Sequence, residues 1–274
     1  KLIETGRGSS ETYLETASVF WDYFQYDEAL QTIRNYRVKS KNKKVYAFEA
    51  GAILESQHKQ KEAISEYLAA LENDEFGKVQ KRLKTLAERG RFAQINATFQ
   101  QQAKSDWKTL YYAEILRDLE KTELANSILR QQITSSKDFE FIESAEQFSD
   151  EIEPIVLNRL ANISTSPRKS ISYHLRLADF YRENNQPDEA KQILANLQQK
   201  FPTNYGVLTE TADFYWSLGA NESAIEVLQN GFKQAKGEYR LAFASRLAKR
   251  LVSLNRLAEA ELFLVEIHQE NPTN

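Results

Sequence analysis

The chain has 274 residues, of which 41% are hydrophobic and 27% charged, a balance typical of a folded protein rather than a disordered one. Its net charge of −3 gives no overall attraction to nucleic acid or anionic membranes, and no apolar stretch is long enough to span a bilayer. It has no Cys, which excludes disulfides and Cys-based zinc sites, and only 9 Gly and 5 Pro, which favours long helices over strands joined by tight turns.

The chain also has no Met, so we expect a processed product or a piece of a longer protein. No signal peptide is visible at the start, and residues 1–11 are predicted to be a linker or the tail of a preceding helix. The compartment and organism stay open. The lack of Cys and Met favours a bacterial protein of the periplasm or cell envelope, with the cytoplasm as the alternative.

From residue 12 onward a short pattern recurs, as in "YDEALQTIRNY" at Tyr26 and "PDEAKQILANL" at Pro187. An Ala marks each copy and returns every 34 to 36 residues within the two regular runs. Between the runs the marker is weaker, and Leu157 replaces it once. The markers are Ala29, Ala63, Ala93, Ala125, Ala190, Ala224 and Ala260.

A second column of small residues stands twelve positions before the well-formed markers, and a large apolar residue follows each after three more positions. The small residues are Ala17, Gly51, Ala113, Ala178, Ala212 and Ala248. Spacings of three and four are helical, and small residues in both columns let two antiparallel helices approach closely. The sequence therefore predicts an all-α, right-handed superhelical solenoid of about eight antiparallel helix pairs.

We divide this solenoid by the regularity of its repeats. Residues 12–75 are predicted to hold two regular repeats, residues 76–166 three degenerate repeats, and residues 167–274 three regular repeats. Gly219 and Pro187 stand at predicted turns between the two helices of a pair.

These columns resemble those of the tetratricopeptide repeat family. The Pro at a repeat end in "FPTN" and "NPTN" is a further similarity to that family. The resemblance runs from about Thr12 to Asn274 and weakens in the middle, where Sel1-like or pentatricopeptide repeats are alternatives. The Trp that the family carries near the start of its first helix is absent. The resemblance implies a non-enzymatic scaffold that binds a peptide or protein on the concave surface formed by the first helices.

Candidate partner-binding residues follow from the columns, because positions one and four residues after the small residue face the concave side. We select from them, and add one Trp that begins another first helix: Trp21, Glu55, Trp107, Glu114, Arg117, Asp179, Arg182, Asp213 and Trp216. Each Trp can alternatively pack on the neighbouring repeat. The mixed charges indicate a polar, charge-patterned partner.

Some family members hold a partner's terminal carboxylate with an inner Asn and Lys. Here Ser18, Ala52 or acidic residues replace the Asn, so we expect that clamp to be missing.

Two other functions remain open. A peptide-sensing regulatory domain fits the same surface, and RNA binding would use the basic run from Lys78 to Arg91. The simpler interpretation of that run is a solvated helix face over buried Val79, Leu83 and Leu86. We expect no cofactor, no metal and no catalysis, since the three His residues are far apart in sequence and no phosphate-binding Gly loop is present.

The final helix, residues 257–270, is apolar around much of its circumference. Solenoids usually end in a helix with a polar outer face, so we expect further chain or a partner to cover it, and the isolated chain to self-associate.

Overall fold

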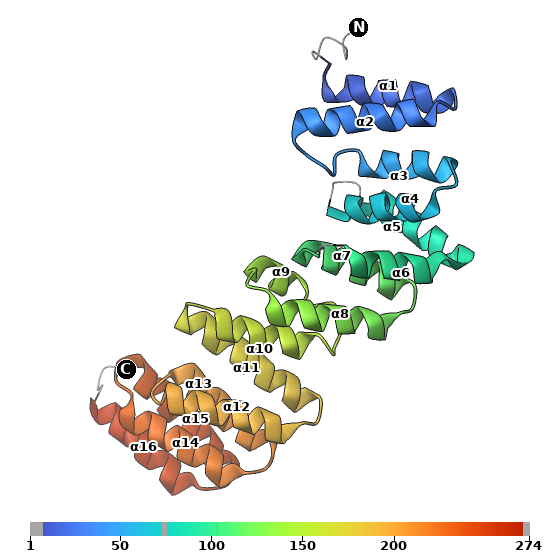
Figure 1. Ribbon diagram of the computed structural model, residues 1–274. Coiled ribbons are helices and arrows are strands. Elements are labelled where there is room, and N and C mark those ends of the chain that lie inside the picture. The colour runs from blue at the N-terminus through green and yellow to red at the C-terminus, as the bar shows by residue number, and fades with distance from the viewer. Residues whose placement is uncertain (1–7, 73–75, 103, 271–274) are drawn as a thin grey trace. The chain divides into compact units, whose positions relative to one another are not determined.

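The computed structural model describes residues 8–72, 76–102 and 104–270, and within these ranges it contains helices and no strand (Figure 1). The chain divides into two compact units, residues 1–145 and 146–274. Each is a stack of helices, and the predicted all-α helical-repeat fold is confirmed.

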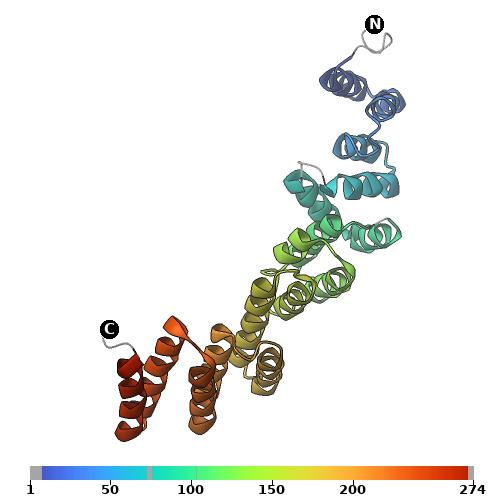
Figure 2. The same ribbon diagram turned by 90° about the vertical axis from the view of Figure 1, so that its left-hand side faces the viewer.

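Unit 1 begins with two regular pairs, continues through short 3-10 and π-helical segments, and ends in a six-residue helix. Figure 2 shows its first helices nearly end-on, as neighbouring coils. Its elements are α1 (Ser10–Asp22), α2 (Tyr26–Ser40), α3 (Ala47–Ser56), α4 (Gln60–Ala69), η1 (Ala70–Glu72), α5 (Phe76–Leu86), η2 (Ala87–Arg91), α6 (Phe92–Gln101), α7 (Asp106–Asp118), α8 (Thr122–Ser135) and α9 (Phe139–Ser144).

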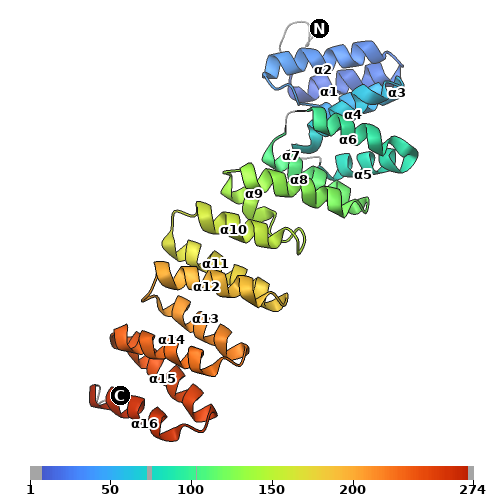
Figure 3. The same ribbon diagram turned by 60° about the horizontal axis from the view of Figure 1, so that its bottom comes forward.

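Unit 2 is more regular, and Figure 3 shows its helices following one another side by side. Helix α10 packs on α11, and the pairs α11–α12, α13–α14 and α15–α16 follow. The elements are α10 (Glu153–Ile163), α11 (Pro167–Glu183), α12 (Pro187–Lys200), α13 (Tyr205–Ser217), α14 (Asn221–Gln234), α15 (Gly237–Ser253) and α16 (Leu257–Glu270).

The same tight turn joins the two helices of each regular pair. One residue adopts a left-handed conformation, and its N–H and the next N–H bond back to the last turn of the first helix, which satisfies carbonyls that the helix end leaves free. In α1–α2, for example, Phe24 N donates to Trp21 O and Gln25 N to Phe20 O. The left-handed residues are Phe24, His58, Glu120, Asn185, Gly219 and Asn255.

The predicted small residues lie at the helix contacts. Ala29, Ala63, Ala190 and Ala224 are each 0% exposed, and the small residues of the first helices are likewise buried. Ala93 is the exception: it is exposed on α6, where Ile95 and Phe99 supply the buried face instead. Its use as a contact marker was therefore wrong.

The section around α5 and α6 departs from the regular pair. Val79, Leu83 and Leu86 form the buried stripe of α5 as predicted, but a wide turn with Gly90 at φ 82° replaces the usual tight one. The boundaries predicted for the regular and degenerate repeats, 12–75, 76–166 and 167–274, stay a prediction, as does the superhelical handedness. Most of the predicted N-terminal linker lies outside the described residues.

Candidate partner-binding surface

The tight turn between paired helices meets each first helix at the same two positions of its last turn. Its two hydrogen bonds end on the residues three and four positions after the buried small residue, for example Tyr215 and Trp216 after Ala212. We call the positions one and four residues after the small residue the first-helix face. None of these residues is buried, and they are Ser18, Trp21, Ala52, Glu55, Glu114, Arg117, Asp179, Arg182, Asp213, Trp216, Lys249 and Val252.

In unit 1 this face is hollowed between α1, α3, α4 and α5. The hollow has a volume of about 480 Å³. We call it the Trp21 hollow, and its lining residues are Trp21, Phe48, Ala52, Glu55, Ser56, Tyr67 and Arg82. The indole Nε1 of Trp21 on α1 donates to Ser56 Oγ on α3 at 3.2 Å. This hydrogen bond therefore holds the indole of the first helix pair against the second pair.

Glu55 forms the polar part of this hollow. Its carboxylate accepts a hydrogen bond from the Tyr67 hydroxyl at 2.9 Å and from Arg82 Nε at 2.8 Å, and Arg82 Nη2 contacts its second oxygen. Burial and the neighbouring Glu55 raise the pKa of Tyr67, and the hydrogen bond to Glu55 raises the pKa of Arg82. The charge of Glu55 is thus neutralised within the unit, and the partly exposed rings of the hollow are those of Trp21 and Phe48.

The three candidates on α7 do not line the Trp21 hollow. Trp107 packs against Tyr111 and Phe141, with ring centroids 6.3 Å apart in both cases. Glu114 is half-buried, and that burial raises its pKa. Arg117 is exposed. The packing interpretation therefore describes Trp107 better than a free anchor does.

In unit 2 the candidates form ion pairs along the first-helix face. Asp179 and Arg182 pair at 2.7 Å on α11. Asp213 on α13 joins two arginines of α15, Arg246 at 2.9 Å and Arg250 at 2.8 Å. The Arg250 guanidinium also lies over the Trp216 ring, 4.3 Å from its centroid, in a cation–π contact.

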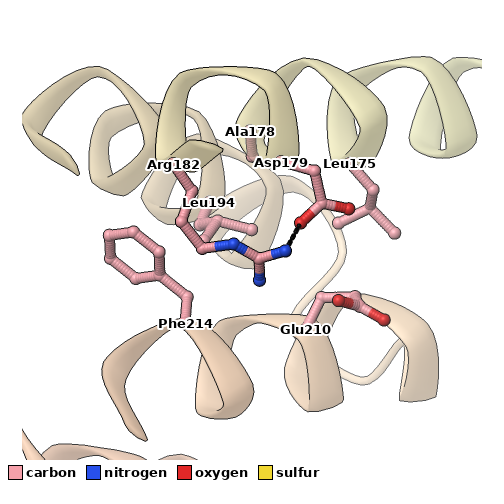
Figure 4. Close-up of a pocket in the computed structure, with 7 residues that line it drawn as sticks. All are labelled: Leu175, Ala178, Asp179, Arg182, Leu194, Glu210 and Phe214. Atoms are coloured by element: carbon pink, nitrogen blue, oxygen red, sulfur yellow. Dashed lines mark ion pairs between the residues drawn. The ribbon is translucent and has the colours of Figure 1, made fainter. Parts of the chain in front are cut away.

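Figure 4 shows where α11 and α12 meet α13. Arg182 reaches toward Asp179, while Glu210 and Phe214 of α13 lie on the facing side. The enclosed space is about 10 Å³, no larger than one water molecule needs, so this is a packed contact and not a ligand site. Burial, reinforced by Asp179 and Asp213, raises the pKa of Glu210.

Several residues of this surface were not among the sequence candidates. The sequence singles out Arg82 only as part of the basic run, and it does not predict a surface role for Arg246, Arg250, Ser56 or Tyr67. The arginines of α15 stand 33 and 37 positions after Asp213, about one repeat away. Opposite charges about one repeat apart in the sequence were therefore the signal that could have predicted these ion pairs.

In the described parts of the chain, no group of three or more His, Asp or Glu side chains is placed to hold a metal ion. Nor does any described helix have the length and apolar character needed to cross a membrane.

The family comparison matches one part of unit 2. Residues 181–244 match the tetratricopeptide repeat family. A solved structure of a tetratricopeptide repeat protein from Parabacteroides merdae ATCC 43184 is similar at 15% identity, covering 95% of this chain and 93% of that chain, with a TM-score of 0.33. No curated protein matches the chain.

The matched residues, which run from α11 to α15 of unit 2, therefore carry repeats of the tetratricopeptide type. Such repeats commonly mediate protein–protein interaction and are generally non-catalytic scaffolds.

Proposed function

We propose that this chain is a non-enzymatic scaffold that holds a peptide or protein segment on its first-helix face, with the Trp21 hollow as the main anchor point. The hollow itself is the observation that carries the proposal. It is open to solvent, and a partly exposed indole lies at its edge. Partly exposed aromatic side chains in a recess are frequent binding hot spots.

The chemistry of the hollow favours an apolar or aromatic partner side chain. The partly exposed Phe48 ring lines the hollow with Trp21 and lies 5.5 Å from the buried Tyr67 ring at a tilt of 51°. Because Arg82 and Tyr67 already satisfy Glu55, an entering side chain meets ring surface without leaving that carboxylate unpaired.

Unit 2 offers a different contact on its own first-helix face. The Asp213–Arg246–Arg250 cluster is half-exposed and carries one negative and two positive charges. A polar partner segment with a carboxylate would fit the excess of positive charge there. This agrees with the charge-patterned partner predicted from the sequence, which stays a prediction.

The test selects binders from a displayed peptide library on the immobilised full chain and then measures each binder's affinity. We expect Trp21→Ala to weaken the selected peptides at least about tenfold. Lys61→Ala, on the exposed side of α4, is the matched control and should leave affinity unchanged. Equal affinity for wild type and Trp21→Ala would place the interface elsewhere.

The RNA alternative receives no support from the geometry of the basic run. Arg82, at its centre, turns into the Trp21 hollow and pairs with Glu55. RNA binding would weaken steeply with salt, whereas peptide binding through an apolar hollow should change little between low and physiological salt. A steep salt dependence of binding at this face would favour RNA over our proposal.

A further inference from the structure

A second groove lies in unit 2, where α12 passes into α13. Its volume is about 900 Å³, and the starts of α11 and α15 also contribute to it. None of its lining residues belongs to the first-helix face. The residues that determine its chemistry are Arg168, Lys200, Phe201, Pro202, Tyr205 and Tyr239.

The groove has an aromatic wall held in place by the core. Tyr205 packs edge-on against buried Phe243, with ring centroids 4.9 Å apart. Tyr239 lies 5.2 Å from Tyr205 at a 31° tilt and is 62% exposed. One tyrosine is therefore anchored while its neighbour presents ring surface to the solvent.

The charged residues lining the groove are both cations. Arg168 and Lys200 are exposed, and no carboxylate is among the described residues that line it. Lys200 lies over the Phe201 ring at 5.5 Å, so positive charge and aromatic surface occupy the same place. This pattern is complementary to a ligand that is both acidic and able to pack on rings.

We propose that this groove docks an acidic, proline-containing segment of a partner protein. Aromatic-lined grooves suit proline because an extended polyproline segment is already ordered and packs its rings on aromatic surfaces. Acidic residues flanking the prolines pair with Arg168 and Lys200. The site is separate from the Trp21 hollow, so it can be present whether or not that hollow binds peptides.

The experiment uses the full chain and three fluorescent peptides in anisotropy titrations. The first has a run of prolines between pairs of glutamates, the second replaces glutamate by lysine, and the third replaces proline by serine. We expect binding of the first alone, with an affinity that falls as salt is raised. The double variant Arg168→Glu/Lys200→Glu should lose at least about tenfold, and Tyr239→Ala should weaken binding as well.

Lys191→Glu is the control, because Lys191 is an exposed residue of α12 outside the groove and its reversal changes the net charge in the same direction. Circular dichroism of each variant confirms that it is folded. Three results would overturn the proposal: no binding of the acidic proline peptide up to about 1 mM, equal binding of the lysine or serine peptide, or equal affinity for the double variant. Trp21→Ala should not affect this peptide, which keeps the two proposals distinguishable.

Discussion

At the scale of single residues, Gly51 shows how the repeat adjusts to a large neighbour. Its counterparts in the other repeats are alanines, but a Cβ at Gly51 would lie 2.7 Å from the ring of Tyr67. Tyr67 is 1% exposed and its hydroxyl bonds to Glu55, so the ring has little freedom to move away. The missing methyl group is what allows Tyr67 to occupy this position.

We therefore predict that Gly51→Ala lowers the free energy of unfolding by about 1–3 kcal/mol through overpacking, despite the better helix propensity of Ala. Gly77→Ala is the control, because nothing lies within 4 Å of its added Cβ. That change should be neutral or slightly stabilising. Urea unfolding of both variants measures the difference in the free energy of unfolding. Equal stabilisation by both substitutions would contradict the prediction, because it would show that the Tyr67 ring shifts to accommodate the added methyl group.

Lys108 is a buried cation, 4% exposed, on α7. Its Nζ donates to Gln102 Oε1. Burial, with a further contribution from Lys44, lowers the pKa of Lys108 to about 8, against an opposing effect of Glu72. At pH 7 the folded protein therefore holds a charge in an unfavourable environment.

Between pH 8 and the ordinary lysine pKa the unfolded chain binds more protons than the folded one at this site, so stability rises with pH. We predict a gain of about 2 kcal/mol from pH 7 to pH 9.5 for wild type relative to Lys108→Met, which lacks the titrating group. Denaturant melts at both pH values measure it. A parallel pH dependence in the two proteins would contradict the lowered pKa.

At the scale of elements, α16 presents an apolar surface. Leu257, Leu262, Leu264 and Val265 are all at least 45% exposed, whereas Phe263 and Ile267 pack toward the core. This matches the apolar circumference read from the sequence. Self-association through this helix stays a prediction.

We predict that the 274-residue chain dimerises or oligomerises through α16, and that Leu262→Glu/Val265→Glu restores a monomer. Val38→Glu is the control, since Val38 is 80% exposed on α2 and belongs to the other unit. Sedimentation velocity over a range of concentrations reports the masses. A wild-type chain that is monomeric throughout would refute this role for α16.

The sequence predicted best those helix pairs in which both helices carry the recurring small residue. Ala29, Ala63, Ala190 and Ala224 are buried because close helix contact demands a small side chain, and such a demand is visible in sequence. Ala93 shows the limit. It stands at the right spacing, but it follows the wide turn after α5 and is exposed, whereas Ile95 is buried in the contact.

The candidate surface was harder to predict, because periodicity indicates that a residue faces outward but not what it pairs with. Glu55 was selected as a groove acid, yet Arg82 from a later helix neutralises it. Apart from Gly219, the left-handed turn residues could not be predicted either, since Phe24, His58 and Glu120 share no side-chain chemistry. Their common feature is a backbone position that hydrogen bonds enforce.

At the scale of the whole molecule, the chain is two units, each with its own core. The match to the tetratricopeptide repeat family lies entirely in residues 146–274, where one buried cluster extends over α13 to α16. Contacts that are mostly internal to a unit make independent folding possible.

We predict that the fragment of residues 146–274 folds alone, with helical circular dichroism and a cooperative thermal transition. Repeat stacks are stabilised by contacts between neighbouring pairs, and unit 2 retains three consecutive pairs and α10. A non-cooperative, sloping melt would show that its stability depends on the rest of the chain.

The central claim is that a protein segment binds on the first-helix face of unit 1. Photo-crosslinking of a library-selected peptide tests it most directly, with p-benzoylphenylalanine placed at Ser18 on that face or at Lys61 on α4; both positions are exposed. We predict a crosslink from Ser18→p-benzoylphenylalanine and none from Lys61→p-benzoylphenylalanine. Crosslinking from Lys61 alone would contradict the account.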